Sequence, residues 1–289
     1  MIDIKYVPSS QRAQTSGQQK FYDLKADGLK IREANFHNYS WKASGIENSD
    51  GMKVTNWKKE PVTYDTSLYL KGGERERANL LDELHSEFER DIDRNTAGLL
   101  FWNGWYIECF ITSSSTYPDN EGHTINDISI YCPYPFWTNE VTLRYKDVIV
   151  EKGDYIFLDY PNTYDYDYSG EQSGRRIVEI GHDFSSDFEL TIFGPANNPR
   201  LNINGHIYQV NVQIPEGDYV IVNSRQSTVI LVHGNTESNI FDLQYKQSDI
   251  FERINTEMVE FQWNGGFEFS IKLFLRSSEP KWKRYGESV

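Results

Sequence analysis

The sequence is poor in cysteine and in long apolar runs. Two cysteines among 289 residues exclude a cysteine-rich zinc module and a disulfide-dense secreted scaffold. Cys109 and Cys132 could form one disulfide, but two buried free thiols in a reducing compartment are the expectation. No apolar run approaches the roughly 20 residues that span a bilayer. Because Met1–Tyr6 also lack the apolar core of a signal peptide, we expect a soluble protein made in a cytoplasm.

Positive charge is scarce as well. Lysine and arginine total 29 against 43 aspartates and glutamates, so the formal net charge is −14. Proteins that bind nucleic acids usually carry a basic face, because their affinity comes largely from phosphate contacts. An acidic chain is also repelled by an anionic membrane surface. We therefore expect neither sequence-specific nucleic-acid binding nor a membrane partner.

The common catalytic signatures are missing too. The patterns G-x-S-x-G, G-x-x-x-x-G-K-[ST], G-x-G-x-x-G and H-E-x-x-H do not occur. No two of the six histidines have the i,i+4 or H-x-H spacing of a metal site; they are His37, His85, His123, His182, His206 and His233. Acidic residues are numerous, but no pair is singled out as the two carboxylates of a glycoside hydrolase. The sequence predicts no catalytic residue, no cofactor and no metal ligand, so a non-enzymatic protein is expected.

One loop carries a partial calcium-binding pattern. Asp165, Asp167, Ser169 and Gly170 match the first positions of a calcium loop. The twelfth position should be a bidentate glutamate, but it is Arg176, whose positive charge opposes calcium. The alternative is an acidic, tyrosine-rich surface loop between strands. We expect the surface loop and keep calcium as a hypothesis.

Aromatic residues, at 15% of the chain, are abundant instead. They argue against disorder and favour many short β-strands, where aromatic side chains pack well. The length suggests two domains, although a single large β-fold is possible. The prolines within Cys132–Trp137 interrupt any β-ladder and predict a domain junction near residue 135. The expected domains are therefore residues 1–135 and residues 136–289.

The first half combines strands with one long helix. Over Glu74–Asp93 the apolar residues recur every three or four positions and form one face: Leu81, Leu84, Phe88 and Ile92. Asn103-Gly104 predicts a tight hairpin between Leu99–Trp102 and the strand that starts at Trp105. Residues 1–19 are expected to form a polar arm or loop, and Asn38–Met52 an exposed loop. Further strands are expected at Lys20–Leu24, Leu29–Arg32, Thr63–Leu70 and Ile128–Cys132.

The second half is expected to be almost wholly β. Short apolar or alternating runs, with turns every 8–12 residues, favour a β-sandwich. Asn204-Gly205 predicts a hairpin of Leu201–Ile203 with Ile207–Val210. A second hairpin is predicted between Val259–Trp263 and Phe267–Leu273. No internal repeat is present, so propellers and solenoids are disfavoured. The fold class is therefore mainly β, with an α+β first half and a sandwich second half.

Three stretches of the chain carry a resemblance to a known family. The first runs from the helix into the hairpin, Leu80–Ile107. The second is the junction Tyr131–Trp137, with its strand-end Pro-Phe-Trp. The third joins Pro199–Gly205 and the strand after it to the closing segment Phe261–Trp282. In order and spacing these stretches resemble the distal tail protein (Dit) family of long-tailed, non-contractile phages and their prophages.

The resemblance implies a structural virion protein. Members of the family form a hexameric ring from an N-terminal split β-barrel with one helix, akin to tail-tube subunits, and carry a galectin-like β-sandwich at the periphery. The ring links the tail-tube protein to the tail-associated or tail-fibre protein, and a receptor-binding protein is a further candidate partner. For this chain the resemblance implies a ring-forming domain at residues 1–135 and a galectin-like domain at residues 136–289. The expected location is the virion tail tip, after synthesis in the bacterial cytoplasm.

Two other functions stay open. A sandwich rich in tyrosine and tryptophan could be a carbohydrate-binding module for host attachment, and a cell-surface hydrolase is the third hypothesis. A galactose-type lectin site needs a polar and aromatic cluster on one strand face, which Asn204, His206 and Trp263 do not form in the linear pattern. The alternating acids and tyrosines of Asp165–Tyr168 suit a protein interface or a solvated loop tip equally. Oligomeric state separates a six-membered hub from a sugar-binding module.

Overall fold

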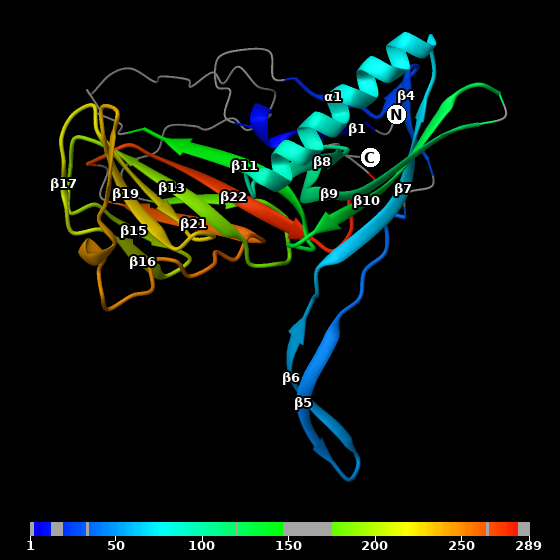
Figure 1. The fold of residues 1–289 in the computed structure, drawn as a ribbon. Coiled ribbons are helices and arrows are strands. Elements are labelled where there is room, and N and C mark those ends of the chain that lie inside the picture. The colour runs from blue at the N-terminus through cyan, green and yellow to red at the C-terminus, as the bar shows by residue number, and fades with distance from the viewer. Residues whose placement is uncertain are drawn as a thin grey trace. The chain divides into compact units, whose positions relative to one another are not determined.

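The computed structural model describes residues 3–12, 20–32, 35–119, 121–146, 175–263 and 266–282, and within them the chain is mainly β (Figure 1). It divides into two compact units: the first combines Met1–Asn139 with Arg276–Val289, and the second is Glu140–Leu275. The division at 139/140 lies close to the junction expected near residue 135. The expected second domain, however, extended to residue 289, whereas the structure assigns the last 14 residues to the first unit.

Aromatic and hydrogen-bond contacts explain why the end of the chain belongs to the first unit. The Trp282 ring stacks on His37 with centroids 3.9 Å apart. Asn103 Nδ2 donates a hydrogen bond of 2.9 Å to the Trp282 carbonyl oxygen. The Arg276 guanidinium lies 5.3 Å from the centre of the Phe136 ring. None of these partners is near in sequence, so no local pattern could reveal them.

In the first unit, one antiparallel sheet contains, in spatial order, β9 (Trp105–Pro118), β10 (Thr124–Cys132), β7 (Val62–Leu70), β4 (Leu29–Arg32) and β3 (Lys25–Ala26). The first part of β9 also pairs with β8 (Gly98–Trp102), which pairs with β1 (Ile4–Val7); β2 (Tyr22–Asp23) lies on the other side of β1. The strand β1 corrects the expected polar arm over residues 1–19. Its four residues were too short a pattern to stand out beside the polar run that follows, which begins with the 3₁₀ turn η1 (Ser9–Gln11).

The helix α1 (Glu74–Asp93) begins and ends at the residues predicted from its periodicity. Leu84 and Phe88 are buried, and the Phe88 ring meets Tyr6 edge-on at 5.5 Å. The last turn differs from the prediction, because Ile92 is 50% exposed and Asp91 is fully buried. The Tyr6 hydroxyl donates a hydrogen bond of 2.5 Å to Asp91 Oδ2, and the Ser9 N–H donates one of 3.0 Å to Oδ1. A buried carboxylate therefore ties the helix to β1.

The segment expected as an exposed loop, Asn38–Met52, instead contributes to a β-hairpin. Its strands are β5 (Lys42–Asn48) and β6 (Gly51–Lys58), and their side chains are exposed except for Ala43, which is partly covered. Figure 1 shows the two strands as a ribbon that extends away from the other strands of the first unit. The expected exposure is therefore confirmed and the expected absence of regular structure is wrong.

The second unit contains two main sheets, as in a β-sandwich. The strands of the larger one are, in spatial order, β20 (Thr236–Asn239), β19 (Thr228–His233), β18 (Tyr219–Asn223), β13 (Asp187–Phe193), β22 (Phe269–Ser277) and β11 (Trp137–Tyr145). The smaller one contains β12 (Arg175–Glu179), β21 (Met258–Trp263), β15 (Arg200–Ile203) and β16 (His206–Gln209). Short pieces complete the unit: β14 (Ala196–Asn197), β17 (Gln213–Ile214) and the 3₁₀ turn η2 (Phe241–Leu243).

Aromatic side chains join the two sheets of the second unit. Phe188 on β13 meets Tyr208 on β16 edge-on at 5.2 Å, and Phe261 on β21 lies 6.0 Å from Phe269 on β22. The predicted pairing of β21 with β22 is therefore wrong, because these strands lie in different sheets that pack face to face. The sequence pattern is the same for a hairpin and for a connection that crosses between sheets.

Two predicted tight turns are confirmed. Asn103 and Gly104 have φ values of 48° and 82°, and Asn204 and Gly205 have 52° and 85°. Positive φ at both central positions is the type I′ geometry that matches the twist of the flanking strands. The strands β8 and β9 accordingly pair up to Trp102 and Trp105, and β15 and β16 pair up to Ile203 and His206.

Candidate interaction surfaces

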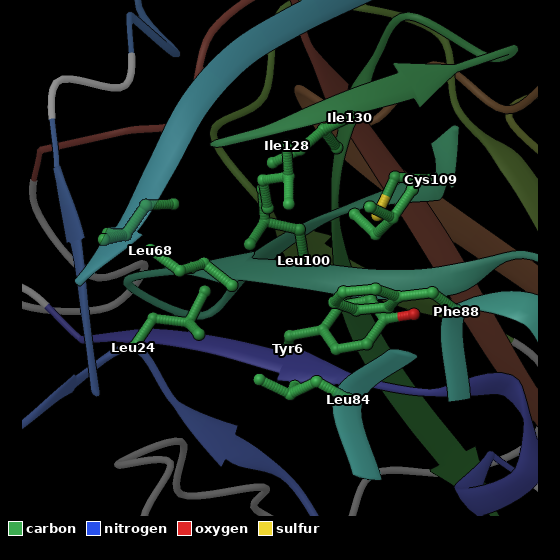
Figure 2. A pocket seen from close by; sticks show the side chains of 11 residues that line it. Tyr6, Leu24, Leu68, Leu84, Phe88, Leu100, Cys109, Ile128 and Ile130 are labelled. Carbon is green, nitrogen blue, oxygen red and sulfur yellow. The ribbon is translucent and has the colours of Figure 1, made fainter. Parts of the chain in front are cut away.

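The interior of the first unit is a packed core. Side chains from α1 and the surrounding strands leave a cavity of about 10 Å³, and Figure 2 shows Tyr6 and Phe88 beside one another at its wall. A space of this size holds at most one water molecule. Burial raises the pKa of the Tyr6 hydroxyl above its usual range, with Cys109 and Asp91 adding to the shift, so the hydroxyl stays a donor to Asp91. The cavity is a gap in the core and not a ligand site.

Both cysteines are buried and free, as expected. Burial raises the pKa of the Cys132 thiol to about 12 and that of Cys109 well above its usual value. A thiol reacts as its thiolate, so a raised pKa makes both groups inert. Neither cysteine is a candidate nucleophile.

The loop between β9 and β10 brings together three potential metal ligands that the sequence analysis missed. One ligand atom each of Asp119, Glu121 and His123 lies within 4.8 Å of the others. Asp119 already accepts hydrogen bonds from the N–H groups of Glu121 (2.9 Å) and His123 (2.8 Å) and from the Tyr69 hydroxyl (3.1 Å). Burial acts to raise the pKa of Asp119, but those backbone N–H groups hold it below its usual value. These hydrogen bonds explain the cluster as a turn that is organised by Asp119. The D-x-E-x-H spacing is the signal by which the sequence could have shown that these three side chains lie close together.

The second half of β9 is an open strand edge in the part of the chain that the structure describes. Thr112–Pro118 are all exposed, and Ser113–Pro118 pair with β10 on one side only. The pairing of β8 with β9 ends at Cys109. Charged residues and prolines usually protect an edge strand from pairing with another chain. This edge has no charged residue, and its one proline, Pro118, stands at the end of the strand. No other described strand pairs with Ser113–Pro118, and Ser114 Oγ lies 3.0 Å from His85 Nε2 of α1.

The residues considered for a lectin site do not form one. Trp263 packs between the sheets of the second unit, with its ring 5.6 Å from Tyr145 and 5.1 Å from Phe269. Asn204 Nδ2 donates to the Asn255 carbonyl oxygen at 2.9 Å. His206 Nε2 lies 2.7 Å from the Asp249 carbonyl oxygen. These side chains support the core and the loops and do not converge on a shared surface.

The outward face of the four-stranded sheet carries an ion pair and aliphatic side chains. Arg175 Nε and Nη2 lie 2.7 and 3.1 Å from the two carboxylate oxygens of Glu260. Ile177 and Met258, on the same face by strand register, are 50% and 57% exposed. Among the described outward positions of β12 and β21 there is no aromatic ring that could stack on a sugar.

The residues of the partial calcium pattern, Asp165–Gly170, lie outside the described residues, and Arg176 stands in β12. Among the described helices, none is both long and apolar enough to cross a membrane.

Comparison with known proteins gives a match in structure but not in sequence. No protein-family model and no curated protein sequence matches the chain. The crystal structure of the phage SPP1 Dit protein, described as a paradigm of the hub adsorption apparatus of phages that infect Gram-positive bacteria, superposes with a TM-score of 0.60 and 13% identity. The match covers 96% of this chain and 99% of the SPP1 protein.

A chain of the phage P2 baseplate, solved in its activated conformation with Ca, gives the same TM-score at 12% identity. That match covers 97% of this chain and 100% of the baseplate chain, and the corresponding structure with Sr gives a TM-score of 0.59. Both units are included in each match. Over nearly its whole length, the chain has the fold of a phage distal tail protein and baseplate hub.

Proposed function

We propose that this protein is a structural component of a phage tail tip, where six copies form a ring that links the tail tube to the tail-associated protein and the host-recognition apparatus. The observation that carries the proposal is the match of the whole chain to two phage hub structures, with 96–97% of this chain and 99–100% of the matched chains covered. Identity of 12–13% supports the fold, and the assignment of the role is our inference.

The first unit is proposed to form the ring. Its open edge at Thr112–Pro118 exposes a row of backbone donors and acceptors that a neighbouring copy could extend as a sheet. The second unit is proposed to hold peripheral tail proteins. Its two sheets already cover one another's apolar faces, so the unit does not need another copy of the chain to bury them. On this proposal the partners are the tail-tube protein, a tail-associated or tail-fibre protein and a receptor-binding protein.

The charge of the chain is consistent with a channel for DNA. Six copies carry six times −14, a formal charge of −84. Phosphates are repelled by an acidic surface, so DNA can pass along such a lumen without being held. The proposed role needs no catalytic group and no cofactor.

Negative-stain electron microscopy of the purified protein, together with light scattering, tests the proposal. Six-fold rings with six times the subunit mass are expected. A protein that stays monomeric at every concentration up to about 100 µM, well above the Kd of a weak specific complex, would contradict it.

A further inference from the structure

The turn between β9 and β10 gathers three ligand atoms of two chemical kinds. Asp119 Oδ2 and Glu121 Oε2 lie 3.3 and 3.7 Å from His123 Nδ1, and the ligand atoms of the three residues, here called the turn site, are within 4.8 Å of one another. Carboxylate oxygen and imidazole nitrogen are donors that bind transition metal ions in proteins. Among the described residues, no other group of three acidic, histidine or cysteine side chains converges in this way.

The turn itself uses only one of the two carboxylate oxygens of Asp119. Oδ1 accepts hydrogen bonds from the backbone N–H groups of Glu121 and His123, at 2.9 and 2.8 Å. The Asp119 N–H closes the turn by donating to the His123 carbonyl oxygen at 3.0 Å. Oδ2 takes no part in these backbone bonds and lies beside the imidazole. The turn therefore holds Oδ2 and Nδ1 next to each other without using either of them to form its backbone.

The distances between these atoms fit a small tetrahedral ion. Zinc binds histidine nitrogen and carboxylate oxygen at about 2.0–2.2 Å, which places the ligand atoms of a tetrahedral site about 3.3–3.6 Å apart. Asp119 Oδ2 and His123 Nδ1 already have this separation, and Glu121 Oε2 is slightly farther from Nδ1, at 3.7 Å. Because the Glu121 side chain is 77% exposed, a small rotation closes the difference without moving the backbone. Three protein ligands leave the fourth position to water.

Tyr69 on β7 orients two of the three ligands. Its hydroxyl donates to Asp119 Oδ2 at 3.1 Å and lies 2.7 Å from His123 Nδ1. A hydrogen bond to a ligating carboxylate commonly fixes the orientation of a metal ligand from outside the coordination sphere. When an ion takes Nδ1, the hydroxyl keeps Asp119 as its acceptor. Tyr69 therefore acts as a positioning residue for the turn site.

Neighbouring charges indicate which class of ion fits. The Arg32 guanidinium and the Lys71 ammonium lie 4.8 and 5.5 Å from the centre of the Tyr69 ring, so positive charge stands near the turn site. Calcium needs six to eight oxygen ligands, and magnesium prefers an octahedron of oxygens. Two carboxylates with two cations close by suit neither ion. A transition metal ion also gains a bond to the imidazole. We propose that the turn site binds a divalent transition metal ion, with zinc as the best fit, independently of the proposed ring.

The test is isothermal titration calorimetry of the chelator-treated, full-length protein with zinc chloride. His123→Asn and Glu121→Gln should each weaken zinc binding at least about tenfold, which is about 1.4 kcal/mol. Glu121→Gln is the more informative variant, because the turn uses the backbone N–H of Glu121 and its carboxylate is exposed. His233→Gln is the matched control and should bind zinc as the wild type does. His233 also lies against one aspartate, Asp218, at 2.7 Å, but it belongs to no three-residue cluster among the described residues.

Cobalt(II) chloride gives a second readout. The wild type should develop the visible absorption of tetrahedral cobalt, zinc should abolish it, and His123→Asn should lack it. The inference is overturned if the wild type binds neither ion, if Glu121→Gln binds zinc as tightly as the wild type, or if His233→Gln loses as much affinity as His123→Asn. Tighter binding of calcium than of zinc would overturn the class of ion. None of these measurements depends on assembly, so the site and the proposed ring can fail separately.

Discussion

Two strands of this protein each carry apolar side chains on one face, but in opposite environments. In β6 the large apolar side chain Trp57 is 58% exposed, whereas in β21 Phe261 is fully buried between two sheets. In the second unit, each of the two main sheets covers the other. Among the described residues of the first unit, the β5–β6 ribbon has no opposing sheet, and the second half of β9 has a pairing strand on one side only. The second unit thus buries its apolar strand faces within itself, whereas the β5–β6 ribbon of the first unit leaves its apolar side chains exposed among the described residues.

Separating the two units should give the largest effect. A chain in which a short Gly-Ser linker joins residue 139 directly to residue 276 should form rings, because it keeps the whole first unit, which is proposed to form the ring. The isolated second unit should remain monomeric. Light scattering of both fragments checks this.

A fragment that ends at residue 136 is the informative control for the separated first unit. It lacks the stack of Trp282 on His37 and the contact of Arg276 with Phe136, so it should unfold at a lower temperature than the linked fragment. Rings from the isolated second unit, or none from a well-folded linked fragment, would reverse the proposed division of roles.

Truncation of one aromatic residue in β21 and of one in β6 should have different effects on the free energy of unfolding. Phe261→Ala should lower the free energy of unfolding by about 3–5 kcal/mol, because it leaves a cavity between the sheets. Trp57→Ala should change it by less than about 0.5 kcal/mol when measured on the monomer, since the side chain is exposed. Urea unfolding below the assembly concentration measures both. Equal losses would mean that the ribbon is packed within its own chain.

The last turn of α1 offers a smaller effect in the same experiment. Tyr6→Phe removes the hydroxyl that donates to the buried Asp91 and should cost about 1–3 kcal/mol, the penalty for a buried polar group that loses its partner. Ile92→Ser, at the neighbouring exposed position, should cost about 0.5 kcal/mol or less. If Ile92→Ser lowered the free energy of unfolding more than Tyr6→Phe, Ile92 would belong to the buried face of the helix, as its periodicity predicted.

The base of the β5–β6 ribbon, where Lys59 follows β6, should show a pH dependence. Burial lowers the pKa of Lys59 to about 8, against about 10.4 for an unfolded lysine. Between these values the unfolded chain binds more protons, so the stability contributed by Lys59 should rise as the pH increases from about 8 to about 10. The stability of the wild type relative to Lys59→Met should therefore be greater at pH 9.5 than at pH 7.

Lys53→Met, on the exposed strand β6, is the control for the pH experiment and should show no such change. A difference for Lys59→Met that is the same at both pH values would mean that the aromatic rings around the ammonium, those of Tyr39, Trp41 and Phe136, offset its burial.

Several features of the fold were predictable because neighbouring residues specify them. The periodicity of apolar residues located α1 over Glu74–Asp93, and two Asn-Gly pairs located type I′ turns through their positive φ values. The low cysteine count favoured free, buried thiols, and Cys109 and Cys132 are both free and buried. The overall resemblance to a phage hub protein also came from the order of local motifs, and the structural matches agree with it.

Other features depended on contacts that no local pattern contains. Periodicity placed Ile92 in the core, but Tyr6 and Ser9, more than 80 residues away, provide the partners that bury Asp91 instead. Alternation predicted a hairpin of β21 with β22, but the strands entered opposite sheets. The polar composition of Asn38–Met52 predicted a loop and not a strand. The strands β5 and β6 are polar because most of their side chains are exposed to solvent.

The amino-acid sequence by itself determined the mainly β character, the helix, the tight turns and the acidic charge of this protein, because each depends on residues within a few positions or on composition alone. Only the tertiary structure decided which strands pair, that the last residues return to the first unit, and which apolar side chains stay uncovered. The physical reason is that burial depends on what lies opposite a residue in space, and residues that lie near it in the sequence do not specify that surface.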